Sequence, residues 1–306
     1  MKIGIFAFSG TGNTLAVAEL YKRFAERLSC DNTVEIFRIT SGETYSVDGF
    51  DVVGVGFPVH AFSAPEPAVE FCKRLEAVKG DKKRAFVFMT SGEGLKMNER
   101  AADKCVGLMK KRGYDVVSVR HFVMPYNMIF RHNDDMAKHM WIYAHALADA
   151  NVRDIAAGKR EKVKRRHVKS LWLAPIGFIE QRFAHAHGPR FKVDEDKCVG
   201  CDRCVNTCPE HNIKKIDGKY VFGHDCVLCM DCSFGCPKDA VRVGLFKYWK
   251  VHGSYRLDAL KADKSIPFPV EKARRQKFGM LYKRYYRRVD KKLKAAGIDV
   301  TEYLEG

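Results

Sequence analysis

Long apolar runs are missing from this 306-residue sequence, and none approaches the roughly 20 residues that a membrane-spanning helix needs. No small-residue cleavage site follows the apolar segment after Lys2, so no secretory leader is recognisable. We therefore expect a soluble, cytoplasmic protein.

Two common nucleotide-binding fingerprints are also absent. A Walker A loop needs the pattern GxxxxGK[ST], which does not occur. The Rossmann pattern GxGxxG would need a glycine three residues after Gly12, where the sequence has Leu15. The sequence therefore shows neither a P-loop nor a nicotinamide-binding fingerprint.

Acidic residues are scarce relative to basic ones, but only in the second half of the chain. The net charge is +17, from 54 Lys and Arg against 37 Asp and Glu. Residues 1–150 carry 20 of these basic and 18 of these acidic residues, which leaves 34 and 19 for residues 151–306. The first half is nearly neutral, and the second half is strongly basic.

Cysteine is unevenly distributed. Three of the 11 cysteines, Cys30, Cys72 and Cys105, are scattered and are expected to be small hydrophobic residues. The other eight lie between Cys198 and Cys236. In a cytoplasmic chain such a cluster indicates metal binding rather than disulfides.

Apolar runs in the first half alternate with segments of helical periodicity. The predicted strands are 2–9, 33–39, 51–59, 84–91 and 115–124, and the predicted helices lie near 14–28, 66–78, 98–112 and 133–157. Continuous apolar strands that alternate with helices predict a doubly wound α/β fold, a five-stranded parallel sheet covered on both faces. Such a sheet binds its ligand at the carboxyl ends of the strands.

The segment SGTGNT follows the first predicted strand and opens the first predicted helix. Its glycines allow a sharp turn on which backbone N–H groups can converge, and its hydroxyls add donors for an anion such as phosphate. It contains no Lys or Arg, so neutral donors would bind the phosphate. The alternative is an ordinary turn that caps a helix. The loop consists of Ser9, Gly10, Thr11, Gly12, Asn13 and Thr14.

This loop resembles the FMN-phosphate loop of flavodoxins, and the order of elements extends the resemblance over roughly residues 1–155. The resemblance implies a flavodoxin-like fold with FMN held by the loops after strands three to five. The residues implied to flank the flavin ring are Phe57, Pro58, Val59, His60 and Ala61. Those implied to meet its polar edge are Ser91, Gly92, Glu93 and Gly94, with Tyr126 and Asn127 as further candidates. For His60 alone, an exposed loop histidine is the alternative.

The clustered cysteines form two copies of one pattern, C-x2-C-x2-C-x3-C-P, offset by 28 residues. The first copy holds Cys198, Cys201, Cys204 and Cys208, and the second holds Cys226, Cys229, Cys232 and Cys236. Four-cysteine zinc sites use pairs of CxxC rather than triplets followed by C-P, so the spacing favours iron–sulfur clusters over zinc.

Residues 189–245 resemble the bacterial ferredoxin module with two [4Fe–4S] clusters. In that pattern the fourth cysteine of each copy ligates the cluster of the other copy. The resemblance therefore implies one site made by Cys198, Cys201, Cys204 and Cys236. It implies a second site made by Cys226, Cys229, Cys232 and Cys208.

A basic helix is predicted over residues 274–297, with an apolar stripe at Phe278, Leu281, Tyr285, Val289 and Leu293. The stripe could pack on the protein's own domains and leave a solvated basic face. The basic face could instead meet an acidic protein partner or a membrane surface, and nucleic acid is the least favoured alternative.

The whole chain resembles flavodoxin–ferredoxin fusion proteins. We expect a flavodoxin-like FMN-binding domain (1–157), a basic and apolar helical linker (158–190), a small α+β ferredoxin-like domain (191–246) and a basic helical extension (247–306). The resemblance implies an electron-transfer protein that passes single electrons between two [4Fe–4S] clusters and FMN. Its partner would be a protein redox carrier such as an acidic ferredoxin, a flavodoxin or an oxidoreductase. The alternative is a reductase in which the clusters feed FMN, which then reduces a small substrate.

Overall fold

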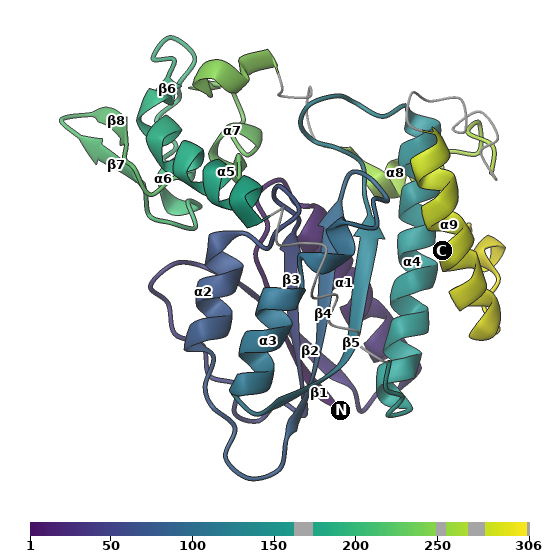
Figure 1. Cartoon of the computed structure of the whole chain (residues 1–306). Helices are drawn as coiled ribbons and strands as arrows, with labels where there is room; N and C mark the ends of the chain where they lie inside the picture. The colour runs from purple at the N-terminus through teal and green to yellow at the C-terminus, as the bar shows by residue number, and fades with distance from the viewer. Residues whose placement is uncertain (162–173, 249–254, 269–278, 305–306) are drawn as a thin grey trace.

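The computed structural model of the protein describes residues 1–161, 174–248, 255–268 and 279–304. An α/β domain forms the body of the molecule, and a small cysteine-rich module sits at one end of it (Figure 1). None of the helices within the described ranges is long and apolar enough to cross a lipid bilayer.

The central sheet has five strands, and every neighbouring pair is parallel. Its strands are β1 (Lys2–Ala7), β2 (Thr33–Arg38), β3 (Val52–Pro58), β4 (Lys83–Ser91) and β5 (Tyr114–Val123). Their order is β2-β1-β3-β4-β5, which is the flavodoxin-like order, so the predicted fold class is confirmed. The order reverses at β1, which places the switch point beside the loop that follows this strand.

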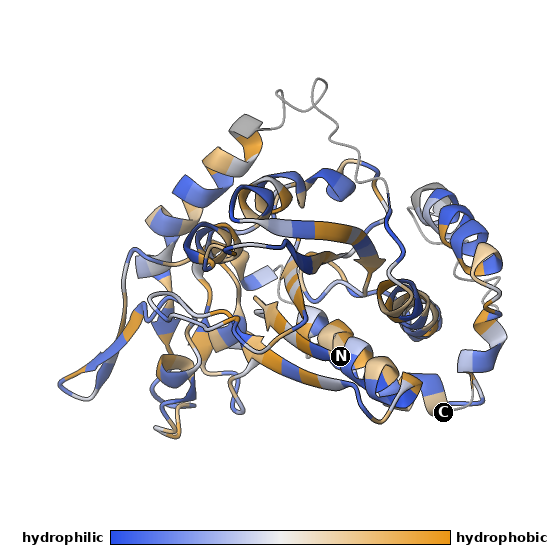
Figure 2. Cartoon of the chain, turned by 90° about the horizontal axis from the view of Figure 1, so that it is seen from below, coloured by the Kyte–Doolittle hydropathy of each residue, from blue (hydrophilic) through white to orange (hydrophobic). Residues whose placement is uncertain are grey.

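Helices cover both faces of the sheet, as the apolar strands require (Figure 2). They are α1 (Asn13–Leu28) and α4 (Asp134–Ala156) on one face, and α2 (Glu66–Arg74), the 3-10 turn η1 (Asn98–Arg100) and α3 (Asp103–Lys111) on the other. Helix α4 begins where the Asn133 side chain accepts a hydrogen bond from the Met136 N–H. The two resulting cores hold the carboxyl ends of all five strands at one edge.

The cysteine-rich module consists of short elements. They are α5 (Ala174–His187), η3 (Gly188–Arg190), β6 (Lys192–Val193), α6 (Arg203–Asn206), β7 (Ile213–Ile216), β8 (Lys219–Phe222), α7 (Asp231–Phe234), β9 (Val241–Arg242) and η4 (Gly244–Tyr248). Strand β6 pairs antiparallel with β9, and β7 with β8. The residues before α6 and α7, Asp202 and Met230, are 28 positions apart and both left-handed, with φ of 55° and 63°. The sequence repeat is therefore also a structural repeat.

The end of the predicted linker is an ordered part of this module. Residues 185–190 complete α5 and form η3, because His187 is fully buried among the rings of Phe183, Phe191 and Phe246. Residues 162–173 of the predicted linker lie outside the described residues.

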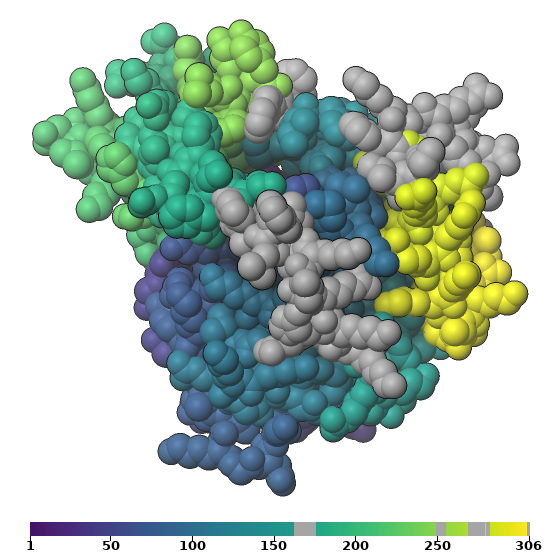
Figure 3. All heavy atoms as spheres, in the orientation of Figure 1, coloured from purple at the N-terminus to yellow at the C-terminus, as the bar shows by residue number. Residues whose placement is uncertain are grey.

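The described part of the tail packs against the α/β domain (Figure 3). It contains α8 (Leu257–Ala262), α9 (Gly279–Ala295) and η6 (Val300–Tyr303). From the predicted stripe, Tyr285, Val289 and Leu293 are buried in the same core as α1 and α4, so the stripe packs on the protein's own domain. Phe278 and the side chain of Leu281 lie outside what the structure describes.

Candidate functional site

A cavity of about 500 Å³ lies at the carboxyl edge of the sheet, where the fold predicts a ligand. The loop after β1 forms its floor. Gly12 has a φ of 98°, a left-handed conformation that glycine adopts without strain. Within the described residues no side chain caps α1 at this end, so the first N–H groups of the helix remain available to an anion.

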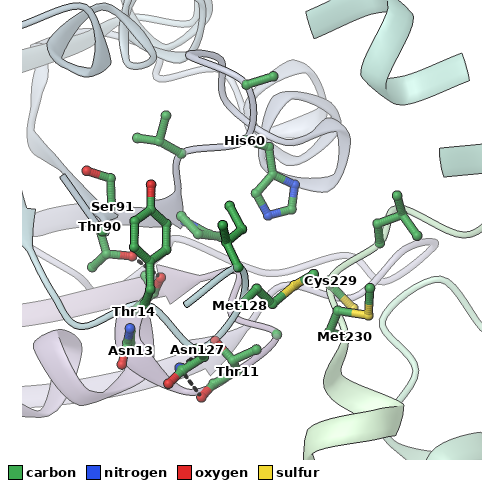
Figure 4. Close-up of a pocket in the computed structure, with 18 of the residues that line it drawn as sticks. Thr11, Asn13, Thr14, His60, Thr90, Ser91, Asn127, Met128, Cys229 and Met230 are labelled. Carbon is green, nitrogen blue, oxygen red and sulfur yellow. Dashed lines mark hydrogen bonds between the residues drawn. The ribbon is translucent and has the colours of Figure 1, made fainter. Parts of the chain in front are cut away.

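Side-chain hydrogen bonds fix this loop (Figure 4). The hydroxyl oxygens of Thr14 and Thr90 lie 2.9 Å apart. Asn127 Nδ2 donates to Thr11 Oγ1 at 2.8 Å, and Asn13 Nδ2 donates to the carbonyl of Pro125 at 2.8 Å. The loop after β1 is therefore connected to the loops after β4 and β5, which lie far away in sequence.

The structure brings most of the sequence-predicted flavin residues together around this one cavity. Those that line it are Ser9, Gly10, Thr11, Asn13, Thr14, Pro58, Val59, His60, Ala61, Ser91, Gly92, Glu93, Tyr126 and Asn127. A Cβ atom on Gly92 would lie 2.5 Å from the Tyr126 ring. The close neighbour that requires glycine at this position is therefore a side chain of the protein.

Three sequence-predicted residues do not line the cavity. The prediction that Phe57 flanks the ring is wrong, because its side chain is fully buried in the core under α2 and α3. Successive side chains of a strand point to opposite faces, and the Phe57 side chain lies on the face of the sheet that α2 and α3 cover. Gly12 shapes the loop, and Gly94 lies outside the lining.

The sequence reasoning missed two groups of lining residues. The first group belongs to the α/β domain and comprises Thr90, Asn98, Pro125, Met128 and Ile129. The second group comes from α5 and the cysteine-rich module and comprises Glu180, Phe183, Leu228, Cys229, Met230 and Phe246. Thr90 directly precedes a predicted loop residue and could have been found. No local pattern signals the second group, because tertiary packing alone brings it to the cavity.

The cysteine-rich module closes the cavity by direct backbone contact. A Cβ atom on Gly10 would lie 1.9 Å from the carbonyl oxygen of Cys229, so only glycine can occupy this position. The N–H of Ser41 donates to the carbonyl of Pro209 at 2.6 Å. Arg38 forms an ion pair with Asp231 at 3.0 Å, and Asp231 is buried. Figure 4 shows Cys229 entering the cavity from the side opposite Thr90.

Burial changes the protonation of two groups in the cavity wall. It lowers the pKa of His60 to about 4, so the imidazole is neutral at pH 7. It raises the pKa of Glu180 to about 7, so a large share of this carboxyl is protonated near neutral pH. Burial also raises the pKa of Glu93, the other carboxyl of the wall, so burial disfavours the charged form of all three groups.

The eight cysteines fall into two groups in space. One small cavity is lined by Cys198, Cys201, Cys204 and Cys236. In the other group, the charges of Cys208, Cys226 and Cys229 all raise the pKa of the Cys232 thiol, after the larger effect of burial. The fourth cysteine of each copy thus lies with the first three of the other copy, which is the arrangement that the ferredoxin resemblance implies.

One backbone contact to sulfur recurs in both halves of the repeat. The N–H of Asn212 donates to Cys208 Sγ at 3.4 Å, and the N–H of Ala240, 28 residues later, donates to Cys236 Sγ at 3.2 Å. Burial raises the pKa of Cys226 to about 11, so an uncompensated thiolate there would be costly. Among the described residues no three His, Cys, Asp or Glu side chains converge closely enough to hold a single metal ion. The thiols of the first group line a small cavity and do not converge on the position of a single ion.

Comparisons with known proteins match the cysteine-rich module. A family model described as a 4Fe-4S binding domain matches residues 190–213. Over 61 residues the chain is 36% identical to an uncharacterized ferredoxin of Methanocaldococcus jannaschii, a match that covers 18% of this chain and 78% of that protein. A second uncharacterized protein of the same organism is 32% identical over 77 residues, which cover 24% of this chain and only 29% of that relative's length.

Solved structures match the α/β domain. A flavodoxin from the domain Archaea is similar to the chain at 18% identity with a TM-score of 0.34, and the match covers 50% of this chain and 99% of that one. Because this score is low, the fold assignment rests on the observed strand order.

Proposed function

The chain belongs to the ferredoxin family, with a flavodoxin-like domain joined to its cysteine-rich module, and from this premise we propose that it passes single electrons between two [4Fe–4S] clusters and FMN. The electron-transfer role itself follows from the family. The number of clusters, the identity of the flavin and the path between them are the parts that we propose.

Two all-thiol sites support the proposed clusters. Cys198, Cys201, Cys204 and Cys236 would hold one, and Cys208, Cys226, Cys229 and Cys232 the other. Thiolate is the ligand that iron–sulfur clusters use, and the raised pKa of Cys226 means that the iron charge is needed to stabilise its thiolate. The matching N–H···S hydrogen bonds would further stabilise negative charge on the sulfurs.

The cavity at the sheet edge supports the choice of FMN. The uncapped start of α1 and the hydroxyls of Thr11 and Thr14 form a neutral anion site, suited to a phosphate group. The apolar side chains of Met128 and Phe183 and the ring of Tyr126 would surround a flat ring system. When bound, FMN would supply a centre that exchanges one or two electrons, whereas a cluster exchanges one at a time.

The observation that carries the proposal is the contact between the two parts. The second thiol group shares its Cys229 backbone with the wall of the flavin cavity, at the carbonyl oxygen that Gly10 touches. The electrons would therefore pass between FMN and the second thiol group, to which Cys229 belongs. They would then pass between the second and the first thiol group. The module also covers part of the cavity. Joining the centres in one chain makes the transfer intramolecular at high effective concentration.

We also propose that electrons arrive from, or leave to, a protein carrier. Small redox carriers are often acidic, and the strong positive charge of residues 151–306 suits such a partner.

The function is tested with protein purified without oxygen, which should contain about eight irons and one FMN per chain. Cys226→Ala should leave FMN bound but slow the reduction of flavin by a reduced ferredoxin about a hundredfold, as seen in the flavin absorbance. Direct photoreduction of the flavin should be unchanged. Cys30→Ala, at an exposed cysteine outside both thiol groups, is the matched control. Two zinc ions in place of iron, or equal rates in both variants, would overturn the proposal.

One observation favours a second function, the reduction of a small substrate at the flavin. Glu180 faces the cavity from α5, and its raised pKa leaves it able to give a proton near neutral pH. For a reductase, Glu180→Gln should abolish turnover of small acceptors while electron transfer to a carrier protein continues. The covered cavity favours the carrier over this reductase.

A further inference from the structure

A second cavity, of about 290 Å³, lies at the other end of α1 from the proposed phosphate loop. It is formed by α1, α4, α8 and η6, and neither the cysteine-rich module nor the flavin cavity contributes to it. Four basic side chains line it, those of Arg23, Arg27, Arg153 and Lys261. Two carboxylates, Asp149 and Glu302, line it as well.

One of the two carboxylates, Asp149, is already bound by other residues of the protein. Asp149 accepts two hydrogen bonds from Arg153, at 2.9 and 2.8 Å, and one from the Tyr303 hydroxyl. By contrast, Arg23 and Arg27 make no ion pair or hydrogen bond with any residue that the structure describes. Two guanidinium groups, one helical turn apart, therefore have their donors available at the cavity mouth.

The cavity also contains a buried acceptor. His145 is only 2% exposed, and its Nδ1–H donates to the carbonyl of Trp141 at 2.9 Å, so Nε2 carries the lone pair. Nε2 lies on the other side of the ring, is buried, and has no hydrogen-bond partner among the described residues. Burial, and then the nearby charges of Lys261 and Arg23, lower the pKa of His145 to about 4, which keeps the ring neutral. A buried acceptor without a donor is costly and indicates a missing ligand or water.

We propose that this cavity binds a small phosphate-bearing anion in its singly protonated form. The P–OH group would donate to His145 Nε2, and Arg23 and Arg27 would bind the remaining oxygens. A carboxylate or sulfate would satisfy the guanidinium groups but would leave Nε2 without a donor. The volume exceeds that of phosphate alone and leaves room for an organic substituent against the buried ring of Phe24.

The test uses the full chain loaded with FMN, so that the proposed flavin site does not take up the probe. Calorimetric titration with inorganic phosphate should show one site, with sulfate about tenfold weaker because it has no proton to donate. Arg23→Gln should weaken phosphate binding about tenfold. Lys22→Gln removes the same charge from the neighbouring residue of α1, which does not line the cavity, and should change nothing.

Further titrations distinguish a soluble phosphate ester from a lipid headgroup. A nucleoside monophosphate that binds more tightly than inorganic phosphate would identify a soluble phosphate ester. Binding only to vesicles that contain phosphatidic acid would identify a lipid headgroup. His145→Phe should remove the preference for phosphate over sulfate, and Arg23→Gln, at an exposed position, remains informative if that variant does not fold. Equal binding of both anions, or no effect of Arg23→Gln, would overturn the proposal.

Discussion

At the scale of single residues, the Thr14 hydroxyl lies at the meeting point of two loops and the proposed phosphate site. It is buried and paired with Thr90 at 2.9 Å. One of these hydroxyls donates to the other, and the one that accepts keeps its own proton, which can point toward the cavity. Thr14 therefore connects two loops and, when it accepts from Thr90, would donate to a bound ligand.

Thr14→Val should weaken FMN binding about tenfold, because it removes one donor and leaves Thr90 without its partner, a loss of about 1–3 kcal/mol. The measurement is the free FMN left in an ultrafiltrate at a series of protein concentrations. Iron content should be unchanged, since the thiol sites lie in another part of the chain. Thr33→Val, at the exposed start of β2, is the control. Unchanged FMN affinity in Thr14→Val would contradict the role of this hydroxyl.

At the scale of secondary-structure elements, periodicity predicted all five strands and the four main helices of the α/β domain. Those patterns are local, because a strand buried on both faces has to be continuously apolar and a covering helix has to be amphipathic. Predicted strand 51–59, for example, is β3 at Val52–Pro58. The position of the loop between β1 and α1 was predicted for the same reason, since it lies between two such patterns.

The part of the cavity wall that comes from α5 and the cysteine-rich module could not be predicted in this way. Phe183 and Cys229 reach the cavity from segments that follow all five strands of the sheet in sequence, and no periodicity encodes that meeting. Phe57 was misassigned because loop and strand meet at Pro58, and a shift of one residue moves a side chain to the other face. The spacing of the cysteines, in contrast, did imply their crossed grouping.

That crossed grouping predicts opposite effects for two equivalent cysteines. Cys208→Ala should damage the cluster held by the downstream copy, and Cys236→Ala the cluster held by the upstream copy, because each fourth cysteine lies with the other group. Each variant should keep about four irons per chain, with one of two electron paramagnetic resonance signals lost. If Cys208→Ala instead removes the signal that Cys201→Ala removes, the ligand assignment is wrong.

At the scale of the whole molecule, charge and cofactors are separated in space. Helix α9 carries exposed basic residues such as Arg287 and Lys291, yet it packs on α4, away from the cysteine-rich module (Figure 1). Two clusters of about −2 each and an FMN phosphate of about −2 would reduce the net charge of +17 only to about +11. The chain therefore keeps a positive field, and part of the charge that makes it lies on α9, away from the cysteine-rich module.

Such a field should steer an acidic carrier to the protein. The second-order rate constant for reduction by an acidic ferredoxin should fall about tenfold or more as salt rises from about 0.05 M to about 0.5 M, because the Debye length shortens. Reduction by a small reductant of low charge should barely change. Replacing Arg287 and Lys291 together with Glu should lower the low-salt rate without changing the high-salt rate, because the substitutions alter the field and leave the thiol sites intact. A rate constant that is insensitive to salt, or a faster reaction with a basic carrier, would rule out the acidic partner.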